Sequence, residues 1–407
     1  MNNFEEYFLM DVASVIDYAR KKLNIFGDGE ELTASEIGDG NLNYVFRVKS
    51  EATGKSVIIK QAGLELRIAK DFDISVDRNR IEVGMLKLEK KICPNLVADI
   101  YHYDSVMKCF AMEDLSDYTV MRNALMKHDI FPKFAGDITD FLVYTLFMTT
   151  DRVMDSKEKK ALVQEYINPQ LCADITEALV FTEPYNDEKK RNRVFAPNLD
   201  FVQKELYCDK ELHLEVAKLK YDFMNNAQAL IHGDLHTGSI FIKHDSTKVM
   251  DPEFAFYGPM GYDIGNIVAN MIFAWMNGNA TMDESVEKDR YLAWVEEVIC
   301  QVVDLFKTKY DSLFDRYVIE PMAKTPGYKK YFLQTILADT AGATGLEINR
   351  RVVGLAQVKD LTAIPNEKKR KHAERICILA AKEFIKKRNT YTEGQHYVDV
   401  IKNLVGE

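Results

Sequence analysis

Two acidic sites stand 17 residues apart in segment 230–263: Asp234 comes first, and the pair Asp251 and Glu253 follows. Between them lie two short runs of β-branched or apolar residues, joined by a polar turn at 244–247, and this pattern predicts a β-hairpin. The hairpin would bring the two acidic sites together. One carboxylate that receives a hydroxyl proton, facing two that hold Mg²⁺ on a nucleotide, is the arrangement that phosphoryl transfer needs. The segment therefore favours a small-molecule kinase.

Other chemistries fit the same segment less well. His232 and His236 have the i, i+4 spacing of a zinc pair, but that spacing needs a helix, and Gly233 with the flanking strand residues argues against one. The chain contains no G-x-x-x-x-G-K-[ST] phosphate loop and no G-x-S-x-G nucleophile elbow. Phosphoryl transfer without a phosphate loop of that type remains the best interpretation.

The elements upstream of this segment suit a lobe that covers a nucleotide. Three segments have the composition of strands, at 31–37, 44–48 and 56–60. The first link contains glycines, which let backbone N–H groups approach phosphate oxygens, and Lys60 ends the third strand with a positive charge for the same phosphates. The residues of this predicted nucleotide loop are Gly38, Asp39, Gly40 and Asn41. An ordinary hairpin turn and a solvated lysine are the alternatives.

A predicted helix at 77–91 carries Glu82 beside its apolar stripe. A helix after the third strand can hold Lys60 through an ion pair, so Glu82 is the expected partner, and an exposed helical glutamate is the alternative. Two further strands, at 97–103 and 109–112, would complete a five-stranded sheet. The connection after them would offer backbone groups to adenine, through Met112, Glu113, Asp114 and Leu115.

Mostly helical periodicity follows the predicted sheet. Residues 218–230 are expected to form a helix that leads into the acidic segment. Asp263 is expected to cap the following helix, 263–276, and to reach back to the loop of Asp234.

These elements predict an α+β fold of the protein-kinase-like, bilobal type. Residues 1–114 would form a lobe with a five-stranded antiparallel sheet that covers the nucleotide. Residues 115–407 would form a mainly helical lobe that carries the catalytic loop and the acceptor site.

An arginine pair stands out in a nearly uncharged helical stretch. Within 341–358 the only charged residues are Glu347, Arg350 and Arg351. Adjacent positions on a helix point about 100° apart, so one of the two arginines must face an apolar environment, where a guanidinium needs an anionic or polar partner. That partner is either Glu347 or another acid in an internal salt bridge, or a substrate or phosphate that the pair binds.

Composition excludes several classes of protein. The formal net charge of −10 argues against a general nucleic-acid binder. Six cysteines without a C-x-x-C pair are typical of reduced thiols in a cytosolic protein. The N-terminal residues lack a signal-peptide pattern, and the most apolar segment, 141–148, is too short to cross a bilayer. We therefore expect a cytoplasmic protein with no membrane or nucleic-acid partner.

The motifs HGDLHTGSI at 232–240 and DPEFAFYGPMGYDIG at 251–265 resemble the 5-methylthioribose kinases. These enzymes form a family within the aminoglycoside-phosphotransferase and choline-kinase branch of the protein-kinase-like fold. Residues 38–46 and the arginine pair are also similar to that family's nucleotide loop and substrate-binding arginines. Most members of the wider branch have a metal-binding asparagine at the position where this chain has Ser239. The D-x-E pattern formed by Asp251 and Glu253 is similar to that of the methylthioribose kinases. Metal binding would then depend more on the two acids.

The resemblance implies ATP-dependent phosphorylation of the 1-hydroxyl of 5-methylthioribose, a step of methionine salvage, by a homodimer. In that reaction Asp234 would orient the hydroxyl and accept its proton, and Lys60 would hold the ATP phosphates. The remaining roles are a Mg²⁺ site at Asp251 and Glu253 and a sugar site at Arg350 and Arg351.

Two alternatives remain open at this point. The first is a related kinase with a choline, homoserine or aminoglycoside acceptor, which the arginine pair disfavours because it would repel a cation. The second is a catalytically silent nucleotide-binding module. The presence of Lys60, Asp234, Asp251 and Glu253 together argues against a silent module.

Overall fold

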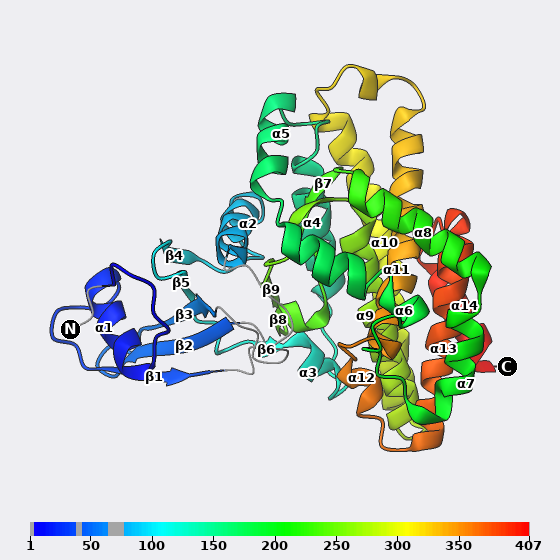
Figure 1. Cartoon of the computed structure of the whole chain (residues 1–407), viewed down its shortest axis with the longest axis horizontal. Helices are drawn as coiled ribbons and strands as arrows, with labels where there is room; N and C mark the ends of the chain where they lie inside the picture. Colours follow the sequence, from blue (N-terminus) through cyan, green and yellow to red (C-terminus); the bar gives the residue numbers. More distant parts are fainter. Residues whose placement is uncertain (1–3, 38–42, 64–76, 407) are drawn as a thin grey trace.

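The computed structural model describes residues 4–37, 43–63 and 77–406 of the 407-residue chain. Figure 1 shows a smaller part built on a β-sheet beside a larger, mainly helical part. The predicted α+β class is confirmed. The boundary between residues 114 and 115 falls in the connection that follows the sheet, and it stays a prediction.

The sheet contains five strands: β1 (Leu32–Glu36), β2 (Asn43–Ser50), β3 (Ser56–Ala62), β4 (Ile100–Asp104) and β5 (Cys109–Glu113). They pair antiparallel in the order β1-β2-β3-β5-β4, so the predicted meander and its two additional strands are confirmed. The register puts Lys60 opposite Val45 of β2 and Phe110 of β5. Lys60 therefore lies on the central strand of the sheet.

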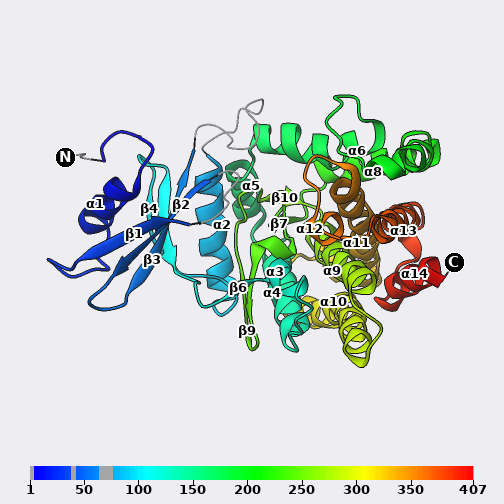
Figure 2. The same cartoon turned by 90° about the horizontal axis from the view of Figure 1, so that it is seen from below.

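Helices cover both faces of β3, which explains why its side chains are buried on both sides. Because side chains alternate along a strand, Val57 and Ile59 share a core cluster with α1 (Val12–Lys22), whereas Ile58 joins the cluster that contains Leu86. Leu86 belongs to α2 (Arg78–Ile92), and Figure 2 shows α1 and α2 on opposite sides of the sheet. Glu82 of α2 is held in this way against the sheet face that carries Lys60.

The helical part is built around one fully buried helix, α9 (Gly261–Thr281), whose residues from Gly261 to Gly278 are all buried. A helix that is buried on every side belongs to the centre of a large core. The long helices around it are α4 (Phe134–Met148), α10 (Val286–Tyr317), α11 (Tyr328–Val353) and α13 (Glu367–Lys386).

Glycines let α9 and α11 approach each other closely. A Cβ on Gly261 would lie 2.5 Å from the Thr340 nitrogen, and one on Gly265 would lie 2.7 Å from the Ala343 Cβ. Larger residues would push the two helices apart. This packing matters because α9 carries Asp263 and α11 carries the arginine pair.

Shorter elements complete the described chain. The helices are α3 (Met121–Leu125), α5 (Ser156–Glu165), α6 (Glu183–Asn186), α7 (Leu199–Val202), α8 (Lys210–Asn225), α12 (Lys359–Thr362) and α14 (Gln395–Gly406), with π-helical turns at Leu171–Glu177 and Gln203–Tyr207 and 3-10 turns at Ala196–Asn198, Thr237–Ser239, Met322–Lys324 and Arg388–Thr390. The short strands are β6 (Thr119–Val120), β7 (Ala229–Ile231), β8 (Ile240–Lys243), β9 (Ser246–Val249) and β10 (Phe256–Gly258). Within the described ranges, no helix combines the length and the hydropathy needed to cross a bilayer.

The predicted helix at 218–230 is wrong at its end. Helix α8 stops at Asn225, and residues 229–231 form β7, which pairs antiparallel with β10. All three residues of β7 are buried. A short run of buried apolar residues has the same pattern in a strand and in a buried helix, so periodicity could not separate the two.

Candidate active site

The predicted hairpin is present as β8 and β9, and it joins the two acidic loops. Gly233 has φ +84°, and a Cβ there would lie 2.2 Å from the Phe254 carbonyl oxygen. The His232 ring donates from Nε2 to the Met250 carbonyl oxygen at 2.8 Å. The loop of Asp234 is therefore packed directly against the loop that begins at Asp251.

Asp263 supports the first loop rather than capping its own helix. Helix α9 begins at Gly261, so Asp263 is its third residue, and the predicted cap is wrong. The Asp263 carboxylate instead accepts hydrogen bonds from the backbone nitrogens of His232, at 2.7 Å, and Gly233, at 3.0 Å. The expected contact with the loop of Asp234 is therefore confirmed, and it fixes the backbone just before Asp234.

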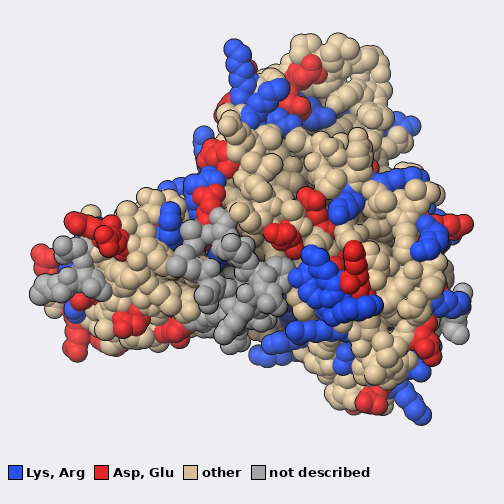
Figure 3. Space-filling view, in the orientation of Figure 1, with Lys and Arg blue, Asp and Glu red and all other residues tan. Residues whose placement is uncertain are grey.

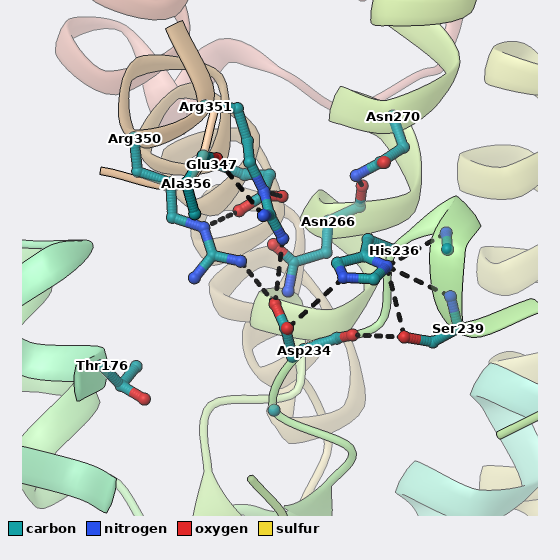
Figure 4. A network of polar contacts seen from close by, with 12 residues as sticks. Thr176, Asp234, His236, Ser239, Asn266, Asn270, Glu347, Arg350, Arg351 and Ala356 are labelled. Atoms are coloured by element: carbon teal, nitrogen blue, oxygen red, sulfur yellow. Dashed lines mark hydrogen bonds and ion pairs between the residues drawn. The ribbon is translucent and has the colours of Figure 1, made fainter. Parts of the chain in front are cut away.

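Asp234 lies against the arginine pair, as Figure 4 shows. Its Oδ1 accepts a hydrogen bond from Arg350 Nη2 and lies 3.3 Å from Arg351 Nη2. The opposite side of the pair contacts the buried Glu347, which binds Arg350 Nε through Oε2 and Arg351 Nε through Oε1 at 2.8 Å. The internal salt bridge is therefore present, with Glu347 on one side of the pair and Asp234 on the other, and the binding of a substrate or phosphate by the pair stays a prediction.

The charge of Asp234 is stabilised by these neighbours. Burial alone would raise the pKa of Asp234, but Arg350, His236 and Arg351 outweigh it and hold that pKa well below its usual range. An ionised carboxylate of this kind is a weak base. It can orient a hydroxyl, and a loose phosphoryl-transfer transition state needs little more from it.

His236 is a neutral donor toward Asp234. Its Nδ1 accepts from the backbone nitrogens of Gly238, at 3.0 Å, and Ser239, at 3.1 Å, so the ring proton is on Nε2. That Nε2 lies 3.4 Å from Asp234 Oδ2. Burial, with Arg122 and Arg351 close by, lowers the pKa of His236 well below 6.5. The alternative of a zinc pair fails because the segment from His232 to His236 is not helical.

This neutral histidine predicts a pH effect on stability. The unfolded state binds a proton on His236 below pH about 6.5 and the folded state does not, so stability falls as the pH drops through that value. We expect the wild type to lose about 1 kcal/mol more than His236→Gln between pH 6.5 and 5.5. Free energies of unfolding in urea at the two pH values measure this difference, and equal losses in both proteins would contradict a neutral His236.

A second cluster surrounds Lys60. Its Nζ lies 2.6 Å from Glu82 Oε1 and 2.6 Å from Asp251 Oδ1, so the expected ion pair with Glu82 is present. Burial alone would lower the pKa of Lys60, but Asp251, Glu82 and Glu253 outweigh it and raise that pKa. Lys60 is therefore a permanent cation that links the sheet, α2 and the second acidic loop.

Glu253 also belongs to this cluster. Its Oε2 lies 3.3 Å from Asn43 Nδ2 and 3.5 Å from Arg78 Nε. Burial raises the pKa of Glu253, and Lys60 and Arg78 oppose that rise. Asp251 has φ +65°, and 41% of its side chain is exposed. One carboxylate of the second acidic site is thus buried among cations, and the other faces solvent.

The predicted adenine contacts lie at the end of β5 and in the connection after it. There the Asp114 carboxylate lies 2.9 Å from Arg47 Nε, the Glu113 nitrogen donates to the Asp99 carbonyl, and the Leu115 carbonyl accepts from the Tyr118 nitrogen. These bonds fix the connection, and its role in adenine binding, Met112 included, stays a prediction. The predicted nucleotide-loop residues Gly38, Asp39, Gly40 and Asn41 lie outside the described residues.

The structure adds residues to the site that sequence reasoning missed. Asn266 of α9 lies beside Asp234 and the arginine pair in Figure 4. Arg122 of α3 donates from Nη2 to Asn270 Oδ1 at 3.2 Å, and its Nε lies 3.6 Å from Asp360. Arg122 gave no signal, because it is an isolated charge in a short helix. Asn266 and Asn270 did give a signal, because they are polar residues four positions apart in a mostly apolar helix.

Sequence comparisons identify relatives of this chain. The profile described as "Phosphotransferase enzyme family" (APH) matches residues 33–284. Methylthioribose kinase of Geobacillus sp. (strain WCH70) is 38% identical over 370 residues, which cover 91% of this chain and 90% of the relative. Methylthioribose kinase of Escherichia coli O45:K1 (strain S88 / ExPEC) is 38% identical over 368 residues, with 88% and 87% covered.

Similar solved structures include a choline kinase from Cryptosporidium parvum Iowa II, with a TM-score of 0.47 and 13% identity, covering 97% of each chain. A spectinomycin phosphotransferase in complex with ADP and spectinomycin has a TM-score of 0.42 and 13% identity, and the match covers 98% of this chain and 95% of that one.

Proposed function

Because the chain belongs to the phosphotransferase enzyme family, we propose that it is a kinase that transfers the γ-phosphoryl group of ATP to the 1-hydroxyl of 5-methylthioribose. The products would be 5-methylthioribose 1-phosphate and ADP, in methionine salvage. The observation that carries the proposal is the position of Asp234. An ionised carboxylate beside two guanidinium groups, on a loop packed against the Lys60 cluster, suits the transfer of a phosphoryl group to a neutral hydroxyl.

At the acceptor end, Asp234 would orient the 1-hydroxyl of the sugar toward the γ-phosphorus. As the new O–P bond forms and the bond to the β,γ-bridging oxygen breaks, the hydroxyl proton would pass to Asp234 or to the transferred phosphate. Arg350 and Arg351 would bind the sugar and stabilise the charge on the equatorial oxygens. Glu347 keeps both guanidinium groups in place for that task.

At the nucleotide end, Lys60 would contact the ATP phosphates while Glu82 holds its side chain in position. Residues 38–41 would cover the phosphates with backbone N–H groups, and residues 112–115 would contact adenine.

We also propose that the second acidic site binds a magnesium ion together with ATP, since the described residues contain no cluster of three or more His, Cys, Asp or Glu that could hold a metal without a ligand. Glu82, Asp251 and Glu253 bring three carboxylates to two cations, Lys60 and Arg78, and oxygen atoms are the ligands that Mg²⁺ prefers. Asp251 and Glu253 would hold the ion, and Lys60 would then release Asp251 to meet the phosphates. When bound, Mg²⁺ would neutralise charge on the β- and γ-phosphate oxygens.

Charge around the site favours a neutral acceptor over a cationic one. Although the net charge is −10, Lys and Arg side chains gather on the face around α6 and α12 in Figure 3. Together with the arginine pair, such a surface attracts nucleotides and repels choline or an aminoglycoside. We further propose, from the family resemblance, a cytoplasmic homodimer, which light scattering of the purified protein would test.

A coupled assay of ADP release tests the proposed function. The acceptors are methylthioribose, ribose, choline and homoserine, each with ATP and Mg²⁺. We expect methylthioribose to give the highest kcat/KM. A higher kcat/KM for choline or homoserine would show that the acceptor is not methylthioribose. If the protein binds nucleotide but releases no ADP with any acceptor, it is a silent nucleotide-binding module.

A further inference from the structure

Asn266 is a buried residue whose side chain lacks a hydrogen-bond partner within the described part of the chain. Its side chain lies on α9, and the residue is 1% exposed. Among the residues that the structure describes, neither the carboxamide oxygen nor the nitrogen of Asn266 has a hydrogen-bond partner. Figure 4 shows this carboxamide beside Asp234 and the end of Arg351, with no dashed line reaching it. Both hydrogen-bonding functions of Asn266 are therefore directed into the acceptor site.

The other asparagines nearby on α9 are satisfied. Asn270 Oδ1 accepts from the Thr237 nitrogen and hydroxyl, and its Nδ2 donates to the Asn266 carbonyl at 2.9 Å. Asn277 Nδ2 donates to the Asp360 carbonyl at 2.7 Å, and its Oδ1 lies 3.2 Å from His128 Nε2. Buried polar groups nearly always have such partners, because an unpaired one destabilises the fold. Asn266 is one of several exceptions, and its position beside Asp234 is one that a ligand would explain.

A second unpaired group lies one helical turn away. The Tyr262 hydroxyl is buried and has no hydrogen-bond partner in the described part of the chain. Burial raises the pKa of Tyr262, which is also within electrostatic range of Arg350, Glu347 and Asp234, so the hydroxyl keeps its proton and can donate or accept. Asn266 and Tyr262, four positions apart on α9, thus both have side-chain polar atoms without a hydrogen-bond partner among the described residues.

We propose that Asn266 binds a second hydroxyl of the acceptor, on the ring carbon next to the hydroxyl that Asp234 orients. A hydroxyl both donates and accepts, and a carboxamide matches it with an acceptor oxygen and a donor nitrogen. The site would therefore select acceptors with vicinal hydroxyls, such as a furanose 1,2-diol. An amino alcohol with one hydroxyl would leave the carboxamide unpaired and be rejected. This inference rests on the proposed kinase function and specifies its substrate class.

The test compares methylthioribose with its 2-deoxy analogue in the wild type and in Asn266→Ala. For the wild type, kcat/KM should be about 100-fold lower with the deoxy sugar, because the buried carboxamide stays unpaired. For Asn266→Ala, the value for methylthioribose should fall and the ratio between the two sugars should shrink to about threefold or less. A ratio in Asn266→Ala that equals the wild-type ratio would overturn the inference.

Asn277→Ala is the matched control, because it removes a buried asparagine from the same helix. It should keep the wild-type ratio but lower Tm more than Asn266→Ala does, since only Asn277 loses hydrogen bonds within the protein. If Asn266→Ala fails to fold, Asn266→Ser provides the same comparison of sugars.

The activity of the wild type distinguishes failure of this inference from failure of the proposed function. If the wild type phosphorylates methylthioribose and Asn266→Ala keeps the full discrimination, only the inference is wrong. If the wild type phosphorylates neither sugar, the proposed function fails and the inference fails with it.

Discussion

Asp234→Ala is expected to lower kcat by about 1,000-fold or more, while ATP binding stays close to that of the wild type. The substitution removes the carboxylate that, in the proposed mechanism, orients the acceptor hydroxyl. It also leaves the guanidinium groups of Arg350 and Arg351 facing the site with Glu347 as their remaining carboxylate partner. Some loss of stability is therefore expected, and Asp234→Asn keeps the shape of the side chain while removing its charge.

Single-turnover measurement of ADP formation with saturating methylthioribose separates this loss from weak binding. Asp245→Ala is the control, because Asp245 is an exposed acid in the turn between β8 and β9, close in sequence but outside the site. The control should retain wild-type kcat. Turnover by Asp234→Ala or Asp234→Asn within tenfold of the wild type would show that another group orients the hydroxyl.

Asp251→Asn is expected to weaken the binding of ATP in the presence of Mg²⁺ by about 100-fold. A carboxamide is a poorer ligand for Mg²⁺ than a carboxylate, and the half-exposed Asp251 side chain is the accessible member of the acidic pair. Binding of ATP without the metal should change much less, because Lys60 loses one of its carboxylate partners and remains available to the phosphates.

Calorimetric titrations of ATP with and without Mg²⁺ test this prediction on the folded protein. Asp245→Asn makes the same chemical change at an exposed position and should bind Mg²⁺ and ATP as the wild type does. An unchanged affinity of Asp251→Asn for ATP and Mg²⁺ would refute the metal role of Asp251, whatever the effect on turnover.

Much of the fold could be predicted from local signals. The five-stranded antiparallel sheet of an α+β, protein-kinase-like fold was predictable from the strand composition, the turn-rich links and the helix of Glu82. The hairpin of β8 and β9 was predictable because a polar turn separates two apolar runs. Strand β7 was not, because three buried apolar residues have no period of their own. The helix cap predicted for Asp263 was wrong, whereas its predicted contact with the loop of Asp234 is present, as hydrogen bonds from the backbone nitrogens of His232 and Gly233.

The site residues were likewise only partly predictable from the sequence. Spacing singled out Asp234, Asp251 and Glu253, and the uncharged surroundings singled out the arginine pair. Residue types and spacing could not show that the pair and Asp234, more than a hundred residues apart, meet through their side chains, although the family resemblance implied a shared sugar site. The tautomer of His236 depends on two backbone nitrogens that only the folded loop brings to its ring. The unpaired state of Asn266 likewise becomes visible only when every neighbouring donor and acceptor has been assigned.

The central claim is that Asp234 and the arginine pair direct the γ-phosphoryl group of ATP to the 1-hydroxyl of methylthioribose. Phosphorus-31 NMR of the reaction of the full chain with ATP, Mg²⁺ and methylthioribose tests it most directly. We expect one sugar phosphate, formed in an amount equal to that of ADP. Its phosphorus should couple to the anomeric proton of the sugar. Phosphate on another hydroxyl, or ADP with free inorganic phosphate and no sugar phosphate, would contradict it.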